Sequence, residues 1–257
     1  MRNTLAIAHK EVRAYFASPI AYIVIGFFAL LFGWFYIGIL DWFVRQGMQM
    51  GQFGMQGPQN MNVNQQMIRP LLLNMTVVFL FLLPLVTMRT YAEEKRSGTI
   101  ELLLTSPLTD LQIVLGKFLG AMVLYSAMLA VTMIHFGLLF KFGNPDWKPL
   151  AVAYLGLFLF GGCFVSVGLF ISSLTKNQIV AGMVTFAVLL LLWTLNWMSE
   201  SAGPTMQKVL SALSITERFD DFSKGVLSVS HLVYYVSFIS FGLFLTAKSV
   251  DSERWRG

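Results

Sequence analysis

The sequence predicts an all-α, polytopic membrane protein, and two observations support this fold class. Of its 257 residues, 56% are hydrophobic and only 12% are charged, about half the charge of a typical soluble domain. Six apolar runs are also long enough for a transmembrane helix, which needs about 20 residues. They cover residues 20–40, 71–88, 118–140, 150–174, 179–197 and 229–247. We therefore expect six transmembrane helices.

The distribution of lysine and arginine orients these helices. An even number of spans places both termini on the same side of the membrane. Basic residues are denser in the segments on that side, 1–19, 89–117, 175–178 and 248–257, than in the segments on the other side. The positive-inside rule then puts both termini of this multi-pass protein in the cytoplasm. The first apolar run is too long for the core of a cleavable signal peptide.

The composition of the six runs excludes several functions. None contains Asp, Glu, Lys or Arg, the residues that ion-coupled transporters usually bury as relays. His135, near an outer helix end, and the single cysteine, Cys163, are the main titratable candidates at depth besides tyrosines. The chain has no phosphate-binding glycine loop and no His-Glu-x-x-His motif. We expect no enzymatic activity, no metal site and no cofactor in this chain, so energy must come from a partner. The net charge of +5 is explained by residues flanking the spans and does not indicate nucleic-acid binding.

Residues 1–19 are expected to form an amphipathic interface helix that ends at Pro19. Its apolar face is predicted to hold Leu5, Ala8, Val12, Tyr15 and Phe16. Its polar face is predicted to hold His9, Lys10 and Arg13. Such a helix can lie on the membrane surface or dock a cytoplasmic protein, and the two roles are compatible.

The densest charge cluster, "MRTYAEEKRSGTIELLL" at residues 88–104, follows the second span directly. Gly98 permits a sharp turn there, and residues 99–105 form a short amphipathic element. Ser106 as N-cap and Pro107 at the first helical position predict the start of a helix. That helix is expected to continue past Lys117 into the third span, so the loop has two short ordered elements.

Four stretches resemble the type 2 ABC transporter permease family. They are "PLVTMRTYAEEKRSGTIELLLTSPLTDLQIVLGKFLGA" (84–121), "AHKEVRAYFASPIAYIV" (8–24), "SSLTKNQIVAG" (172–182) and "SITERFDDFSKGVLSV" through "VDSERW" (214–255). They are similar to the family's intracellular loop, N-terminal interface helix, turn between spans four and five, and last extracellular helix with the C-terminal end. The gliding-motility-type permease subunit is the nearest branch, and the permease of copper maturation for nitrous-oxide reductase is more distant.

The resemblance implies that residues 1–257 form one permease domain, located as a multi-pass protein in the bacterial cytoplasmic (inner) membrane. Two copies, as a homo- or heterodimer, would pair in the lipid bilayer, and each would dock an ABC ATPase that binds ATP and Mg. Residues 89–117 would be the cytoplasmic coupling loop. The resemblance places the ATPase-coupling interface at Arg89, Glu93, Glu94, Arg96, Gly98, Thr99, Glu101, Leu102, Pro107 and Lys117, beside Lys10, Glu11 and Arg13 of the interface helix. Lys117 could instead anchor the third span by snorkelling.

The resemblance leaves two functions open. The first is export or extraction of a substrate across the membrane. The second is a non-transport scaffold that acts on an extracytoplasmic partner, with an accessory subunit that has a large extracytoplasmic domain. A third reading, an orphan membrane enzyme or secondary transporter, is disfavoured by the uncharged spans.

Three further segments have two interpretations each. Residues 45–66, rich in Met and Gln, read as a flexible polar loop or as soft thioether ligands for Cu(I). The extracytoplasmic segment 198–228 predicts one or two amphipathic helices at the outer membrane surface, for packing or for capping a transport path. Gly162-x-x-x-Ser166 and Gly168-x-x-x-Ser172 give the fourth span small faces for close packing within one chain or across a dimer.

Overall fold

The computed structural model describes residues 2–52, 62–200 and 203–254, and within these ranges it contains helices and no strand. Six helices are long and apolar enough to cross a membrane, which confirms the predicted fold class. They are α2 (Pro19–Gln52), α3 (Arg69–Thr87), α6 (Asp110–Phe142), α7 (Trp147–Leu174), α8 (Gln178–Glu200) and α11 (Val229–Arg254). The shorter elements are α1 (Arg2–Ala17), η1 (Asn64–Ile68), α4 (Arg89–Ser97), α5 (Thr99–Leu104), α9 (Pro204–Leu213) and α10 (Ile215–Ser223).

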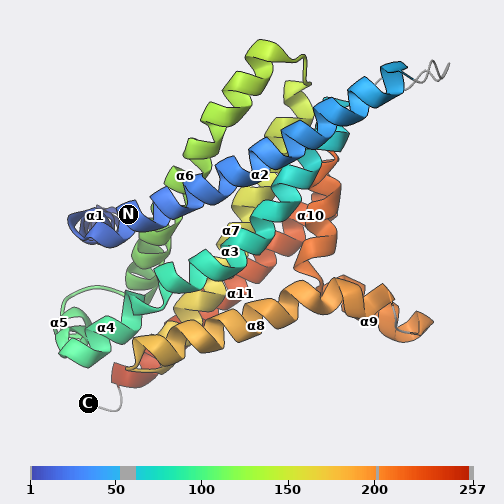
Figure 1. Cartoon of the computed structure of the whole chain (residues 1–257). Coiled ribbons are helices and arrows are strands. Elements are labelled where there is room, and N and C mark those ends of the chain that lie inside the picture. The colour runs from blue at the N-terminus through green and yellow to red at the C-terminus, as the bar shows by residue number, and fades with distance from the viewer. Residues whose placement is uncertain (1, 53–61, 201–202, 255–257) are drawn as a thin grey trace.

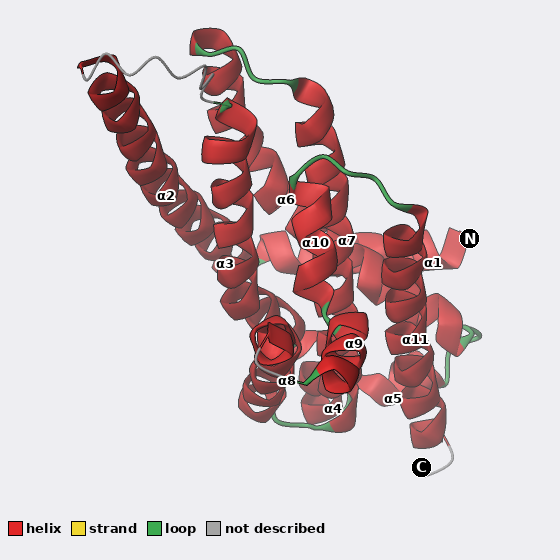
Figure 2. Ribbon diagram, turned by 90° about the vertical axis from the view of Figure 1, so that its right-hand side faces the viewer, coloured by secondary structure: helices red, strands yellow, loops and turns green. Residues whose placement is uncertain are grey.

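Helices α3 and α7 form the centre of the bundle, and α2, α8 and α11 lie at its outside (Figures 1 and 2). The outer helices expose apolar side chains over most of their surface, as expected for helices that face lipid. α7 contacts α3, α6, α8, α10 and α11, so it connects most of the bundle.

The small residues of α7 serve packing inside the chain. A Cβ atom on Gly162 would lie 2.8 Å from Cδ1 of Ile239 on α11, and one on Gly168 would collide with Thr87 of α3. Ser172 hydrogen-bonds to the start of α4. Contacts within one chain therefore account for the small residues of α7, without a dimer contact.

The predicted cytoplasmic elements gather at one end of the bundle. Figure 1 shows the N-terminal helix α1, the pair α4 and α5, and the end of α11 on the same side. Two ion pairs confirm this arrangement: Lys10 lies 3.3 Å from Glu94, and Lys95 lies 2.6 Å from Glu253. The two described ends of the chain therefore lie on one side, as the even number of spans predicts.

Helix α1 crosses the bundle behind α7 in Figure 2, and it packs mainly against α6. Its buried face consists of Ile7, Ala8, Glu11 and Tyr15. The predicted apolar face was therefore only partly right, because Leu5 is 63% exposed and Glu11 points inward. The physical reason is a close approach to α6 that places Glu11 beside a buried lysine.

The start of α6 corrects another prediction. Ser106 and Pro107 do not begin the helix; it begins at Asp110, with Thr109 as N-cap. The Thr109 hydroxyl accepts from the Gln112 amide, and the Gln112 side chain accepts from the Thr109 amide. This capping box satisfies two amides at once, which a serine followed by proline does not do.

The outer segment forms two helices, and they differ in burial. α10 packs beside α7, with Ile215, Phe219 and Phe222 buried, so it is part of the bundle and does not lie on the membrane surface (Figure 2). α9 exposes its apolar residues Met206 and Val209. Of the Met-rich segment predicted at 45–66, residues 45–52 extend α2, residues 64–66 belong to η1, and residues 53–61, where copper binding was considered, lie outside the described residues.

Candidate functional site

The predicted coupling segment folds as two short helices joined at one glycine. Gly98 has φ 75°, in the left-handed region, which ends α4 and begins α5. The Ser97 hydroxyl donates to the Glu93 carbonyl at 2.9 Å and lies 2.9 Å from the Thr99 hydroxyl, which closes the turn from both sides. The predicted turn is confirmed, and the short element after it is a helix in which Ile100 is buried and Leu102 is exposed.

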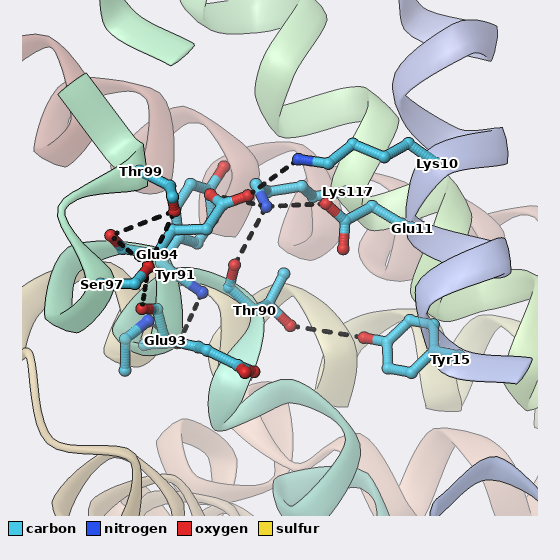
Figure 3. Close-up of polar contacts among 12 residues, drawn as sticks. Lys10, Glu11, Tyr15, Thr90, Tyr91, Glu93, Glu94, Ser97, Thr99 and Lys117 are labelled. Atoms are coloured by element: carbon cyan, nitrogen blue, oxygen red, sulfur yellow. Dashed lines mark hydrogen bonds and ion pairs between the residues drawn. The ribbon is translucent and has the colours of Figure 1, made fainter. Parts of the chain in front are cut away.

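A buried ion cluster ties this segment to two other helices (Figure 3). The Lys117 ammonium on α6 lies 2.9 Å from Glu11 of α1 and 2.9 Å from Glu94 of α4. It also donates to the Thr90 carbonyl at 3.0 Å and faces the ring of Tyr91 at 5.1 Å. We call Glu11, Glu94 and Lys117 the ion triad. It joins α1, α4 and α6 at one point.

The position of Lys117 corrects the snorkelling expectation. Its side chain is 1% exposed, and the Glu11 and Glu94 side chains are 11% and 15% exposed. A lysine snorkels when its ammonium can reach water, but here α1 covers it and two carboxylates neutralise it. Lys117 therefore has a positioning role inside the chain.

Two glycines on α6 allow α1 to come this close. A Cβ atom on Gly116 would lie 2.6 Å from Cβ of Ile7, and one on Gly120 would lie 2.6 Å from Cβ of Glu11. Any larger residue would push α1 away and separate Glu11 from Lys117. The spacing Gly116-x-x-x-Gly120 is a helix-packing signal that the sequence analysis did not use, and it would have indicated this contact.

Helix α4 is held at its base by α7 and α11 as well. The Ser172 hydroxyl accepts from the amides of Tyr91 and Ala92 at 3.1 and 3.2 Å and donates to the Met88 carbonyl at 2.9 Å. The Lys95 side chain is buried and lies 2.6 Å from Glu253 on α11. Sequence reasoning missed Lys95, Ser172 and Glu253 as site residues, and no local pattern links Lys95 to a residue 158 positions away.

The structure divides the predicted site residues other than Arg89, which is half-buried beside Tyr15, into two sets. Those engaged in internal ion pairs are Lys10, Glu11, Glu94 and Lys117. Exposed charges that form no ion pair within the described part of the chain are Arg13, Glu93, Arg96 and Glu101. Leu102 is 74% exposed, and Gly98, Thr99 and Pro107 are also exposed. The second set is therefore the part of the site that a partner can reach.

A groove of about 620 Å³ separates α1 from α4. Its lining includes Lys10, Arg89, Glu93, Ser97 and Thr99, with the two carboxylates of the ion triad. Both signs of charge are present, which suits an interface of defined orientation better than binding of a simple anion or cation.

Two side chains close the wall of this groove towards the start of α2. The Arg89 guanidinium lies 5.1 Å from the centre of the Tyr15 ring. Burial raises the pKa of Tyr15, so its hydroxyl stays protonated and donates to the Val86 carbonyl at 3.3 Å. These contacts hold the Tyr15 and Arg89 side chains in place along the groove between α1 and α4.

Within residues 2–52, 62–200 and 203–254, no cluster of three or more His, Cys, Asp or Glu residues could hold a metal ion. Cys163 is buried in α7, with Sγ 3.9 Å from the Tyr235 carbonyl, which is a packing environment.

Comparison with known proteins agrees with this architecture. The sequence profile of the family described as "ABC-2 family transporter protein" matches residues 45–216, more than half of the chain. Two Escherichia coli proteins, from strain K12 and from O157:H7, are both named "Probable multidrug ABC transporter permease YbhR". Each is 34% identical over 104 residues, which is 40% of this chain and 28% of the relative. The chain thus aligns with just over a quarter of the length of these relatives.

Proposed function

Because the chain belongs to the ABC-2 transporter family, we propose that it is the permease subunit through which a partner ATPase drives export or extraction of a substrate. Members of this family are multi-pass inner-membrane permeases that carry no ATPase site of their own and act with an ABC ATPase, in general as dimers. The observation that supports the proposal most is the construction of α4. Its outer surface carries unpaired charges, while its base is joined to four other helices.

These contacts connect α4 to the membrane-spanning helices, as a coupling element requires. Glu94 joins it to Lys117 of α6, Ser172 of α7 holds its first turn, and Lys95 joins it to the end of α11. A displacement of α4 by an ATPase would therefore move three membrane-spanning helices together. Rigid-body motion of helices in response to a partner is an established kind of switching transition.

The exposed charges of α4 and α5 supply the surface for docking. Glu93 and Arg96 lie on α4 and Glu101 lies on α5, and none of them forms an ion pair in the described part of the chain. Exposed charges of mixed sign favour one orientation of the partner and speed association more than they add affinity. We assign them to recognition of the ATPase.

The test compares two adjacent glutamates on α4. Glu93→Lys, which alters a free charge, should lower association with the co-purifying ABC ATPase about tenfold, or about 1.4 kcal/mol. Its melting temperature should stay unchanged. Glu94→Lys, which alters the ion triad, should destabilise the permease itself. Glu217→Lys on α10, exposed at the other end of the bundle, is the matched charge-reversal control and should leave association unchanged.

The readouts are the ATPase-to-permease ratio after affinity purification in mild detergent and the rate of ATP hydrolysis. If Glu93→Lys and Arg96→Glu both retain the ATPase at the level of the unaltered protein, α4 is not the docking element.

The nature of the substrate is a further part of the proposal. The name of the E. coli relatives, a probable multidrug permease, supports export of small molecules over a non-transport scaffold. The gliding-motility-type branch and an accessory extracytoplasmic subunit remain predictions from the sequence.

A further inference from the structure

Helix α1 has one flank that neither packs against α6 nor lines the groove to α4. One face is buried against α6, and the Lys10 and Ala14 side lines the groove to α4. The remaining flank carries Arg2, His9 and Arg13, all exposed. Their spacing of seven and four residues places them within about 40° of one another around a helix of 3.6 residues per turn. These three side chains form the basic row of α1.

The basic row has no acidic residue to neutralise it on its own helix. Glu11 is the single acid of α1, and it is buried in the ion triad on the opposite side. None of the three basic residues forms an ion pair within the described residues. Arginine keeps its charge at any physiological pH, so the row has at least two permanent positive charges.

An apolar edge runs beside the basic row. Leu5 is 63% exposed. The Phe16 ring packs edge-on against the ring of Tyr22, which lies in the first turn of α2, with 5.8 Å between the ring centres. Tyr22 is 62% exposed and lies at the start of a helix long and apolar enough to cross a membrane, so we expect its exposed surface to face lipid. The apolar edge of α1 is therefore continuous with the lipid-facing surface of α2.

We propose that the basic row of α1 binds the headgroups of anionic phospholipids in the adjacent leaflet. A helix with an apolar edge inserted at the membrane boundary and a basic edge above it lies at the level of the phosphates. Anionic lipids attract juxtamembrane arginines, and each contributes several-fold to binding. The positive charge of the row and the continuity of the adjacent apolar edge with the membrane-facing surface of α2 favour lipid over a protein partner.

The same geometry connects lipid binding with the coupling site. Arg13 is two residues from Glu11, which pairs with Lys117 of α6. Lipid bound along the row would hold α1 down at the membrane and keep Glu11 in the ion triad. This effect of lipid on the coupling site rests on the proposed function, whereas the lipid site itself does not.

The test uses the purified permease alone, without ATPase or ATP, so its outcome is independent of the proposed function. The detergent-solubilised protein is titrated with dioleoyl phosphatidylglycerol and, separately, with dioleoyl phosphatidylcholine, and bound lipids are counted by native mass spectrometry. The double variant Arg2→Gln/Arg13→Gln removes both permanent charges. Lys141→Gln/Lys148→Gln, exposed at the other end of the bundle, is the control with the same loss of charge.

The unaltered protein and the control should prefer phosphatidylglycerol, and the Arg2/Arg13 double variant should bind it about 30-fold more weakly, from two arginine contacts of ordinary strength. Its melting temperature should be unchanged, because neither side chain is buried. Equal binding of the two lipids by the unaltered protein would overturn the proposal. A double variant that binds phosphatidylglycerol as tightly as the unaltered protein would overturn it as well.

Discussion

Replacing Lys117 with methionine should destabilise the protein by about 3–5 kcal/mol, the usual cost of removing one partner from a buried ion pair. Methionine has nearly the length of lysine, so it fills the space and leaves little cavity. What remains is a pair of carboxylates, Glu11 and Glu94, that are mostly buried and have lost the cation between them. The carbonyl of Thr90 loses its donor as well.

The chain contains its own reporter for this measurement. Cys163 is the single cysteine and is buried in α7, so a thiol-reactive fluorogenic dye labels it only when the bundle opens. Thermal unfolding followed by this dye should show a melting temperature roughly 10 °C lower for Lys117→Met, by the scaling for chains of this size. Lys248→Met, which breaks an exposed pair with Asp251, should change it little.

A triple variant tests the reasoning more strictly. Adding Glu11→Gln and Glu94→Gln to Lys117→Met removes every charge of the ion triad and should recover most of the lost stability, because an uncharged cluster has no desolvation penalty. If Lys117→Met melts within about 2 °C of the unaltered protein, or the triple variant is less stable than the single one, the ion triad does not hold α1, α4 and α6 together.

Three other substitutions probe the remaining joints. Gly120→Val should cost about 1–3 kcal/mol by overpacking, because its Cβ would lie 2.6 Å from that of Glu11; faster proteolysis of α1 should reveal this, and unchanged proteolysis would contradict it. Ser172→Ala should cost about 1–3 kcal/mol in thermal unfolding, because it leaves two amides of α4 without an acceptor; a melting curve identical to the parent would show that other groups satisfy them. For Asp220, burial favours a raised pKa, but hydrogen bonds from Lys224 and Arg69 outweigh it and lower the pKa below the ordinary value of 3.8. The contribution of Asp220 to folding stability is thus present above pH 3.8 and lost as the pH falls through the lower folded-state pKa. Asp220→Asn should therefore lower the melting temperature at pH 7 and not in stronger acid. An equal difference at both pH values would contradict this.

Features that depend on local pattern could be predicted from the sequence. The six spans follow from the length of apolar runs, and the break at Gly98 follows from the freedom of glycine. The start of α6 was missed although its signal is equally local. Thr109 and Gln112 form a capping box, but the adjacent Ser106-Pro107 pair is a more conspicuous start signal.

Features that depend on distant partners could not be predicted. Glu11 was assigned to the coupling interface, and nothing near it in the sequence shows that it pairs with Lys117 on α6. The pairing of Lys95 with Glu253 is equally invisible, since it needs the fold to bring α4 and α11 together. The charge pattern therefore indicates the region, but it does not distinguish the residues that form ion pairs inside the chain from those that stay exposed.

The order in which α4 acquires its partners has a consequence for biogenesis. During synthesis Glu11 and Glu94 emerge before Lys117, Ser172 follows, and Glu253 comes after all of them. Helix α4 is therefore made early and fixed late, and until α11 is in place the buried Lys95 has no counter-charge. A chain that stalls before α11 would leave this lysine unpaired at the end of the bundle where α1 and α4 lie.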